Sequence, residues 1–150
     1  MKKKLFLPVA LAAVLLLTAV LAVVHLTSRE QMQPGQLAVV YREKQQTVVF
    51  AELPLQQVKG TISNAKGETF PIDAKGISVA AFLDELDISG YSKVTVVADD
   101  EYRAEVGADE IAADGVVFLI AQEDDSVKLL VFTDKNSKRN VSNVVRVEVS

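Results

Sequence analysis

The sequence predicts an α+β domain dominated by β-strands, with a mixed sheet and one main helix, preceded by an N-terminal transmembrane helix. Three observations lead to this prediction. Residues 5–26 form an apolar run without Asp, Glu, Lys or Arg. Residues 79–86 carry apolar side chains at helical spacing. The rest of the chain after residue 36 holds eight or nine short β-rich segments, with no second helix of similar strength.

The apolar run has the length of a membrane-spanning helix. Its 22 residues suffice to cross a hydrocarbon layer of about 30 Å. Three lysines in residues 1–4 precede it, so we expect this end to stay in the cytoplasm and the domain to lie outside, at the cell membrane. A cleaved signal peptide with a site at Val20-Leu21-Ala22 is the alternative and would give a secreted domain. No cysteine follows the run, which excludes a lipid-modified bacterial lipoprotein.

Charge and cysteine content exclude further classes. The chain has 16 basic residues, and without the three N-terminal lysines 13 remain against 20 acidic residues. A nucleic-acid partner is therefore disfavoured, because phosphate binding needs a basic face. With no cysteine, the domain has no disulfides and depends on its hydrophobic core.

The segments before the main helix predict a linker and two hairpins. Residues 27–36 contain Pro34-Gly35 and predict the linker, which leaves residues 37–150 as the extracytoplasmic domain. The first hairpin is expected at 37–41 and 47–51, around residues 42–46, and the second at 58–63 and 68–72, around the turn 64–67 with its glycine.

The stretch 76–106 predicts the centre of the core. Ser78 precedes the apolar stripe of 79–86 and can cap the helix, while Gly90 is expected to end the element. Residues 94–98 and 102–106 then alternate as a hairpin, and we expect the helix to pack on it.

The remaining segments complete the predicted sheet. Residues 109–113 predict one helical turn that stops at Gly115. Residues 116–121 are continuously apolar, as in a central strand buried on both faces. Residues 127–132 are its expected partner, and residues 144–149 alternate as the last strand.

No catalytic constellation is evident. His25 is the sole histidine and is read as an interfacial residue, so neither a zinc or copper site nor a serine–histidine pair is expected. The acidic runs 99–101 and 123–125 lack the spacing of a calcium loop and are read as solvated turns. A glycosidase carboxylate pair is disfavoured because tryptophan is absent and only three tyrosines occur.

One basic loop is the candidate binding site. Lys135, Lys138 and Arg139 stand among serine and asparagine residues and could donate to a phosphate or carboxylate, although an exposed basic connection is the commoner explanation. Asn140-Val141-Ser142 matches a glycosylation acceptor, a pattern that is frequent by chance.

The order of these segments resembles the oxidoreductase molybdopterin-binding family, which has the sulfite-oxidase-like fold. Asp100 and Tyr102 match a D-G-Y pattern of that family, with Glu101 in place of the glycine. The match covers about 100 residues, and the ordered set carries it rather than any single motif. The resembling segments are 47–53, 75–83, 94–106, 118–121, 128–131 and 138–149.

The resemblance implies a pterin cofactor, with molybdenum held by a cysteine thiolate between the first segment and the helix. This chain has no cysteine, and a neutral side chain cannot supply the charge and softness of a thiolate. Lys135, Lys138 and Arg139 are the residues left for contacts to a pterin phosphate.

Three hypotheses follow from the sequence. The first is a membrane-anchored sulfite-oxidase-like domain that is not an enzyme and that binds a small ligand, such as an anion, or a protein partner outside the cytoplasm. The second is a genuine molybdopterin-dependent oxidoreductase without a protein thiolate, which stoichiometric molybdenum in the purified protein would favour. The third is an unrelated β-rich module for adhesion or wall binding.

Overall fold

The computed structural model describes the backbone of residues 3–28 and 32–150, and the side chains of 8–24 and 32–150. It divides into two compact units, Met1–Gln31 and Met32–Ser150. The described part of the second unit is an α+β domain with nine strands, which confirms the predicted β-dominated α+β class and leaves the sulfite-oxidase-like fold a prediction. Its elements are β1 (Gln36–Tyr41), β2 (Lys44–Val49), the 3₁₀ turn η1 (Phe50–Glu52), β3 (Gln56–Ser63), β4 (Thr69–Ser78), α2 (Val79–Glu85), β5 (Lys93–Ala98), β6 (Arg103–Gly107), α3 (Ala108–Ala112), β7 (Val117–Ala121), β8 (Val127–Val131) and β9 (Val144–Val149).

The first unit is the helix α1 (Lys3–Ser28). Its side chains from residue 8 to residue 24 are exposed. A search of the described residues finds no helix with both the length and the apolar character needed to cross a membrane. The transmembrane helix therefore stays a prediction.

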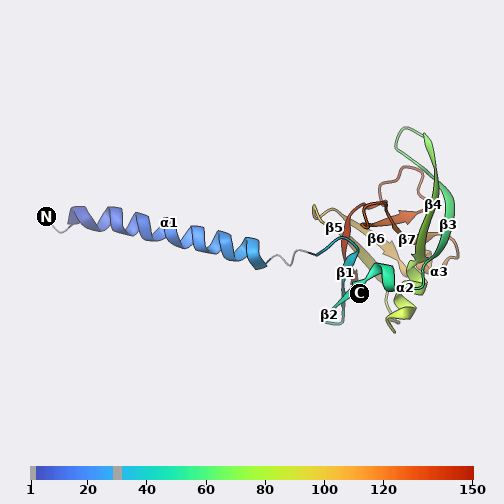
Figure 1. Cartoon of the computed structure of the whole chain (residues 1–150), viewed down its shortest axis with the longest axis horizontal. Coiled ribbons are helices and arrows are strands. Elements are labelled where there is room, and N and C mark those ends of the chain that lie inside the picture. Colours follow the sequence, from blue (N-terminus) through green and yellow to red (C-terminus); the bar gives the residue numbers. More distant parts are fainter. Residues whose placement is uncertain (1–2, 29–31) are drawn as a thin grey trace. The chain divides into compact units, whose positions relative to one another are not determined.

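The strands of the second unit form two sheets, shown in Figure 1. The five-stranded sheet has the order β2-β1-β9-β5-β6 and is mixed, because β1 pairs in parallel with β9. The four-stranded sheet has the order β3-β4-β7-β8 and is antiparallel. The predicted mixed sheet thus holds for one sheet of two, and the first and last strands of the domain lie side by side.

The first hairpin is tighter than predicted. Tyr41 pairs with Lys44, so only Arg42 and Glu43 form the turn, both with positive φ (48° and 64°). Such a two-residue turn matches the twist of the strands that it joins. The absence of glycine or asparagine at these positions explains why the sequence suggested a longer loop.

The main helix begins at the predicted residue but ends before Gly90. The Ser78 hydroxyl accepts a hydrogen bond from the Ala81 amide at 3.1 Å, as an N-cap does. At the other end Asp87 adopts φ 55°, and the Ile88 amide donates to the Leu83 carbonyl at 2.9 Å. This is a Schellman motif with aspartate at the position where glycine is usual.

The core lies between the two sheets, and α2 and α3 contribute to it. The helix α2 packs mainly against β4, β7 and α3 rather than on the β5–β6 hairpin, which corrects the predicted packing. The most deeply buried residues come from both sheets and from α2, and they include Leu37, Phe82, Leu83, Val94, Leu119 and Leu129.

A second apolar cluster lies on the other face of the four-stranded sheet. Val58, Ile120 and Leu130 are its buried centre, with Phe118 and Phe132 packed at its side. Since β7 pairs only with residues 76–78 of β4, the rest of the β3–β4 hairpin extends past it, as Figure 1 shows. Val58 belongs to this hairpin, so the hairpin curls over β7 and β8 and covers their outer face.

The curl brings β3 against the end of β8. A Cβ on Gly60 would lie 2.5 Å from a ring carbon of Phe132, so the ring rests directly on the glycine backbone. The Ser137 hydroxyl donates a hydrogen bond to the Ser63 carbonyl farther along the same strand. These two contacts hold the hairpin over the second cluster.

The contact between Gly60 and Phe132 can be tested by adding one methyl group at position 60. We expect Gly60→Ala to lower the free energy of unfolding of the full-length chain by about 1–3 kcal/mol, because the added Cβ overpacks against the ring. Urea unfolding followed by tyrosine fluorescence measures this change.

The matched control is Gly107→Ala, since no atom lies within 4 Å of a Cβ at that position. Its expected change is below about 0.5 kcal/mol. In the Gly60→Ala background, Phe132→Leu should restore part of the lost stability. Equal losses for the two alanine variants would contradict this packing.

Candidate functional site

A pocket of about 410 Å³ lies at one end of the second cluster. This volume falls in the range of small-molecule sites. Its walls come from β3 and the segment just before it, the end of β4, the start of α2, the segment after α3, β7, and the residue after β8. The lining residues are Pro54, Gln56, Gln57, Val58, Lys59, Gly76, Ile77, Ser78, Ala81, Asp114, Gly115, Phe118 and Phe132.

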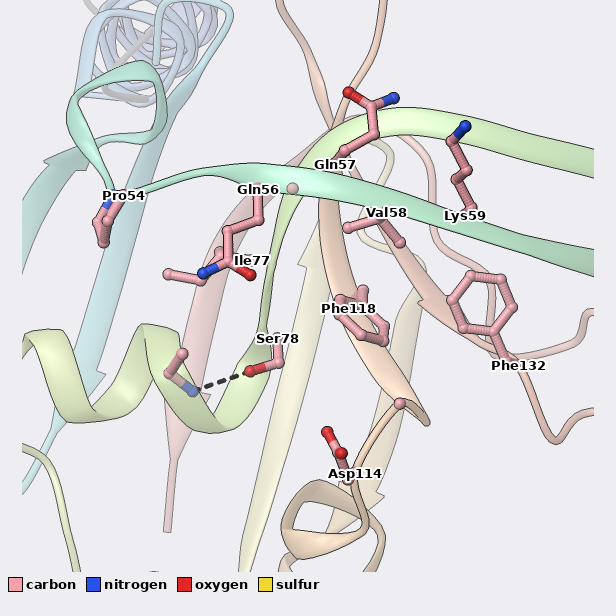
Figure 2. A pocket seen from close by; sticks show the side chains of 13 residues that line it. Pro54, Gln56, Gln57, Val58, Lys59, Ile77, Ser78, Asp114, Phe118 and Phe132 are labelled. Atoms are coloured by element: carbon pink, nitrogen blue, oxygen red, sulfur yellow. Dashed lines mark hydrogen bonds between the residues drawn. The ribbon is translucent and has the colours of Figure 1, made fainter.

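Strand alternation decides which β3 side chains face the pocket. In Figure 2, Gln56 and Val58 point to the side of Ser78 and Phe118, whereas Gln57 and Lys59 point away. Gln56 pairs with Gly76, and Ser78 pairs with Phe118, so these residues share one face of the sheet. The interior of the pocket therefore receives an amide from β3 and a hydroxyl from the end of β4.

The apolar wall is aromatic. Phe118 and Phe132 meet edge to face, with ring centroids 5.7 Å apart and an interplanar angle of 68°. Beside them Gly76 leaves no room for a side chain, because a Cβ there would collide with the Leu119 carbonyl. The absence of a side chain at Gly76 keeps β4 close to β7 and leaves the space open to a ligand.

Three polar side chains face the interior of the pocket, those of Gln56, Ser78 and Asp114. The Ser78 hydroxyl accepts a hydrogen bond from the Ala81 amide, which fixes the side chain, and its own proton remains to be donated. The carboxylate of Asp114, the second residue after α3, points toward Ser78 and Phe118 in Figure 2. The lining holds no cysteine and no histidine.

The sequence-predicted site residues do not line this pocket. Of the basic loop, Arg139 is only partly exposed and its guanidinium is held by two carboxylates. It donates to Glu110 through both terminal nitrogens, at 2.7 and 2.8 Å, and to Asp134 through Nε and Nη2, at 2.9 and 2.6 Å. These four hydrogen bonds connect the loop to α3, and they leave few N–H groups of Arg139 to bind an anion.

The hydrogen bonds between Arg139 and the two carboxylates also shift the pKa values of Glu110 and Arg139. The hydrogen bonds from Arg139 hold the pKa of Glu110 below its ordinary value, against a smaller opposing effect of burial. The hydrogen bonds that Arg139 donates to Glu110 and Asp134 raise its own pKa further, so it stays charged. The arginine that the sequence suggested as an anion contact therefore has a structural role.

Lys135 and Lys138 are exposed and lie outside the pocket lining. The Tyr102 hydroxyl donates to the Lys138 carbonyl at 2.5 Å, which holds the loop backbone and not the ammonium. Asn140, the residue of the glycosylation pattern, accepts the Val131 amide at 3.0 Å and so ties the loop to β8. An anion or pterin-phosphate contact at the two lysines stays a prediction.

The acidic runs lie in turns, as the sequence indicates. Asp100 accepts the Tyr102 amide at 3.0 Å, and Asp124 accepts the Ser126 amide at 3.1 Å. Within the described residues no group of three or more His, Cys, Asp or Glu side chains could hold a metal ion. The side chain of His25 lies outside the described residues.

Sequence reasoning missed most of the pocket. Ser78 was singled out only as a helix cap, and Gln56, Asp114 and Phe132 were not singled out. The alternation of Val58 with polar neighbours marks a strand face, but it does not say what that face covers. The pocket forms from segments about 60 residues apart in the chain, and no local pattern reports such a meeting.

The role of Arg139 can be tested through stability. We expect Arg139→Gln to lower the free energy of unfolding by about 1–3 kcal/mol near neutral pH, after allowance for partial exposure, because Glu110 and Asp134 lose a charged partner. The lowered pKa of Glu110 means that its contribution is full above its unfolded pKa and is lost as the pH falls through the folded pKa. The difference in the free energy of unfolding between the wild type and Arg139→Gln should therefore become smaller below about pH 4.5.

The control is Arg103→Gln, because Arg103 pairs with Glu148 at 3.0 Å in a more exposed setting. Its expected cost is below about 1 kcal/mol. Urea titrations at a series of pH values measure both variants. A pH-independent difference for Arg139→Gln would contradict the pairing with Glu110.

Comparison with known proteins adds no assignment to this geometry. No protein-family model matches the chain, and no curated protein matches it. The molybdopterin-binding resemblance stays a prediction, and the functional argument rests on the pocket.

Proposed function

We propose that this chain is a membrane-anchored, extracytoplasmic and non-catalytic binding module whose pocket holds a small ligand. The observation that carries the proposal is the pocket of about 410 Å³ beside the second cluster. It joins an aromatic wall to a few polar groups that could orient a ligand, which is the usual composition of a binding site.

The residue types argue against turnover. The sequence has no cysteine, and its one histidine, His25, belongs to the first unit. Ser78 Oγ already accepts the Ala81 amide, and the lining holds no imidazole to remove its proton. These residues can hold a molecule but offer no activated nucleophile.

A relation to the sulfite-oxidase-like fold remains part of the proposal. The ordered segments between Thr47 and Val149 support it, and the β-dominated α+β architecture agrees with it at a coarse level. The donor set does not fit molybdenum, however, since the chain has no thiolate and the described residues offer no cluster of three metal ligands. A shared fold without the redox metal is therefore the form of the relation that we propose.

The anchoring part of the proposal rests on residues 5–26 and the three lysines before them. In a bacterial host, we expect the full-length chain to sediment with membranes after alkaline carbonate extraction. Protease added to spheroplasts should digest residues 37–150, because the lysines keep the N-terminus inside.

The control replaces Leu15 and Leu16 with arginine, each at a cost of about 2.5–3.5 kcal/mol in the centre of a spanning helix. This variant should lose membrane association. Recovery of a shortened wild-type chain in the soluble periplasmic fraction would instead support a cleaved signal peptide and overturn the anchor.

Ligand binding can be tested by filling the pocket. Ala81 lines the pocket from the exposed side of α2, so Ala81→Phe should occupy the space with little effect on stability. We expect a library of small metabolites to yield ligands that raise the melting temperature of the wild-type chain, and we expect this variant to lose at least about tenfold in their affinity.

Ala65→Phe is the matched control. Ala65 is exposed in the turn between β3 and β4 and is not among the lining residues. It should bind the same ligands as the wild type. If no compound shows binding that Ala81→Phe weakens, the pocket is not a ligand site and the proposed function fails.

A further inference from the structure

The charged groups around the pocket indicate which ligands it would favour. Two charged residues contribute to the lining, Lys59 and Asp114. The ammonium of Lys59 lies 3.7 Å from the Asp73 carboxylate, and its side chain points away from the pocket interior in Figure 2. Lys59 therefore has its ion-pair partner, Asp73, outside the pocket lining.

Asp114 is in a different position. Its carboxylate makes no hydrogen bond or ion pair with a described residue, and it points toward the space that Ser78 and Phe118 border (Figure 2). The unpaired charge of the pocket is thus negative.

The neutral polar groups do not oppose this preference. The Ser78 hydroxyl and the Gln56 amide can each donate and accept hydrogen bonds on the pocket side of the sheet, and an ammonium group carries three donors. Among the side chains that line the pocket, the Asp114 carboxylate is therefore the group that distinguishes a cation from an anion. An anion would meet the carboxylate without a facing cation.

The apolar part of the lining indicates which group the ligand carries at its other end. Val58, Phe118 and Phe132 form an apolar wall whose rings are already fixed against each other. An aromatic or branched aliphatic group would bury its surface there, at about 25 cal/mol for each Å² removed from water. The pocket thus pairs an apolar end with an end that carries the Asp114 carboxylate.

The electrostatic field of the domain also favours a cationic ligand. The chain beyond Lys4 has 13 basic and 20 acidic residues, and the charge of Arg139 is neutralised by Glu110 and Asp134. Such a surface attracts cations and repels anions over a distance of about 10 Å at moderate salt.

We propose that the pocket binds a small organic cation, namely a primary amine attached to an aromatic or branched aliphatic group, with the ammonium at Asp114 and the apolar group against Phe118 and Phe132. This assignment rests on the proposed function, since it names the ligand class of the same pocket. It concerns the pocket alone, and the anion contact at Lys135 and Lys138 stays a separate prediction.

The test uses three probes of one shape and different charge: phenethylamine, phenethyl alcohol and phenylacetate. Amide shifts of Ser78, Gly115 and Phe118 in ¹H–¹⁵N spectra of the full-length chain report binding in the pocket. We expect the amine to bind about fivefold to tenfold more tightly than the alcohol, because a charge-assisted hydrogen bond is stronger than a neutral one, and we expect the acid to bind most weakly.

Asp114→Asn removes the charge and keeps the size of the side chain. It should erase the preference for the amine and leave the affinity for the alcohol unchanged. Asp109→Asn is the control of equal charge change, on the exposed side of the nearby α3, and should keep the preference. Because Asp114 is exposed, neither substitution threatens the fold.

The outcomes separate this assignment from the proposed function. Equal affinity for the three probes, or an undiminished preference in Asp114→Asn, overturns the amine assignment and leaves the pocket a ligand site. The same holds if no probe moves the pocket amides while the metabolite library yields ligands that Ala81→Phe weakens. Failure of both the probes and the library overturns the amine assignment and the proposed function together.

Discussion

The site depends on one packing constraint: the four-stranded sheet is apolar on both faces. The inner face of β7 and β8 packs into the main core through Leu119 and Leu129, but Ile120 and Leu130 point the opposite way and are also buried. The second cluster contains no residue of α2 or α3, so neither of these helices covers that face. The β3–β4 hairpin must therefore curl back over it, and Gly60 permits the close approach of Phe132 that completes the cover. The pocket is the space left where this cover ends beside Ser78 and Asp114.

Ion pairs hold the loop after β8 in place together with the burial of Val141 in the core. Arg139 satisfies Glu110 on α3 and Asp134 on the loop itself, while Asn140 and Val141 bond to the backbone of β8. This arrangement protects part of the β8 edge, which would otherwise expose unpaired backbone groups. It also fixes the end of β8 from which Phe132 reaches the pocket. A loop that reads in sequence as a basic patch is therefore part of the support for the second cluster.

The chemistry of the pocket is consistent with selection by charge and shape. The side chains of Gln56 and Ser78 can both donate and accept hydrogen bonds, and the Asp114 carboxylate is the lining charge that has no partner among the described residues. A ligand bound there would exchange water contacts for a small number of directed bonds and an aromatic wall. Affinity in such sites comes from apolar burial, while the polar groups decide which ligands are accepted. A family relation to pterin enzymes and a different ligand are compatible, because function resides in the site and not in the fold.

The local elements of the domain can be predicted from the residues alone. The alternation of residues 94–106 and 144–149, the apolar stripe of α2 and its Ser78 cap each depend on neighbours within a few residues, and the structure has them nearly as predicted. The limits of α2 and the Arg42–Glu43 turn differed, because aspartate, arginine and glutamate occupy the positive φ values where glycine or asparagine is the usual signal. Other contacts are evident only in the three-dimensional fold. The strand β1 pairs with β9, and α2 packs on β4 and β7. Arg139 pairs with Glu110, and the pocket is lined by Gln56, Asp114 and Phe132. Those contacts join residues far apart in the chain, and they follow from how two sheets bury their faces together, which no local pattern of side chains encodes.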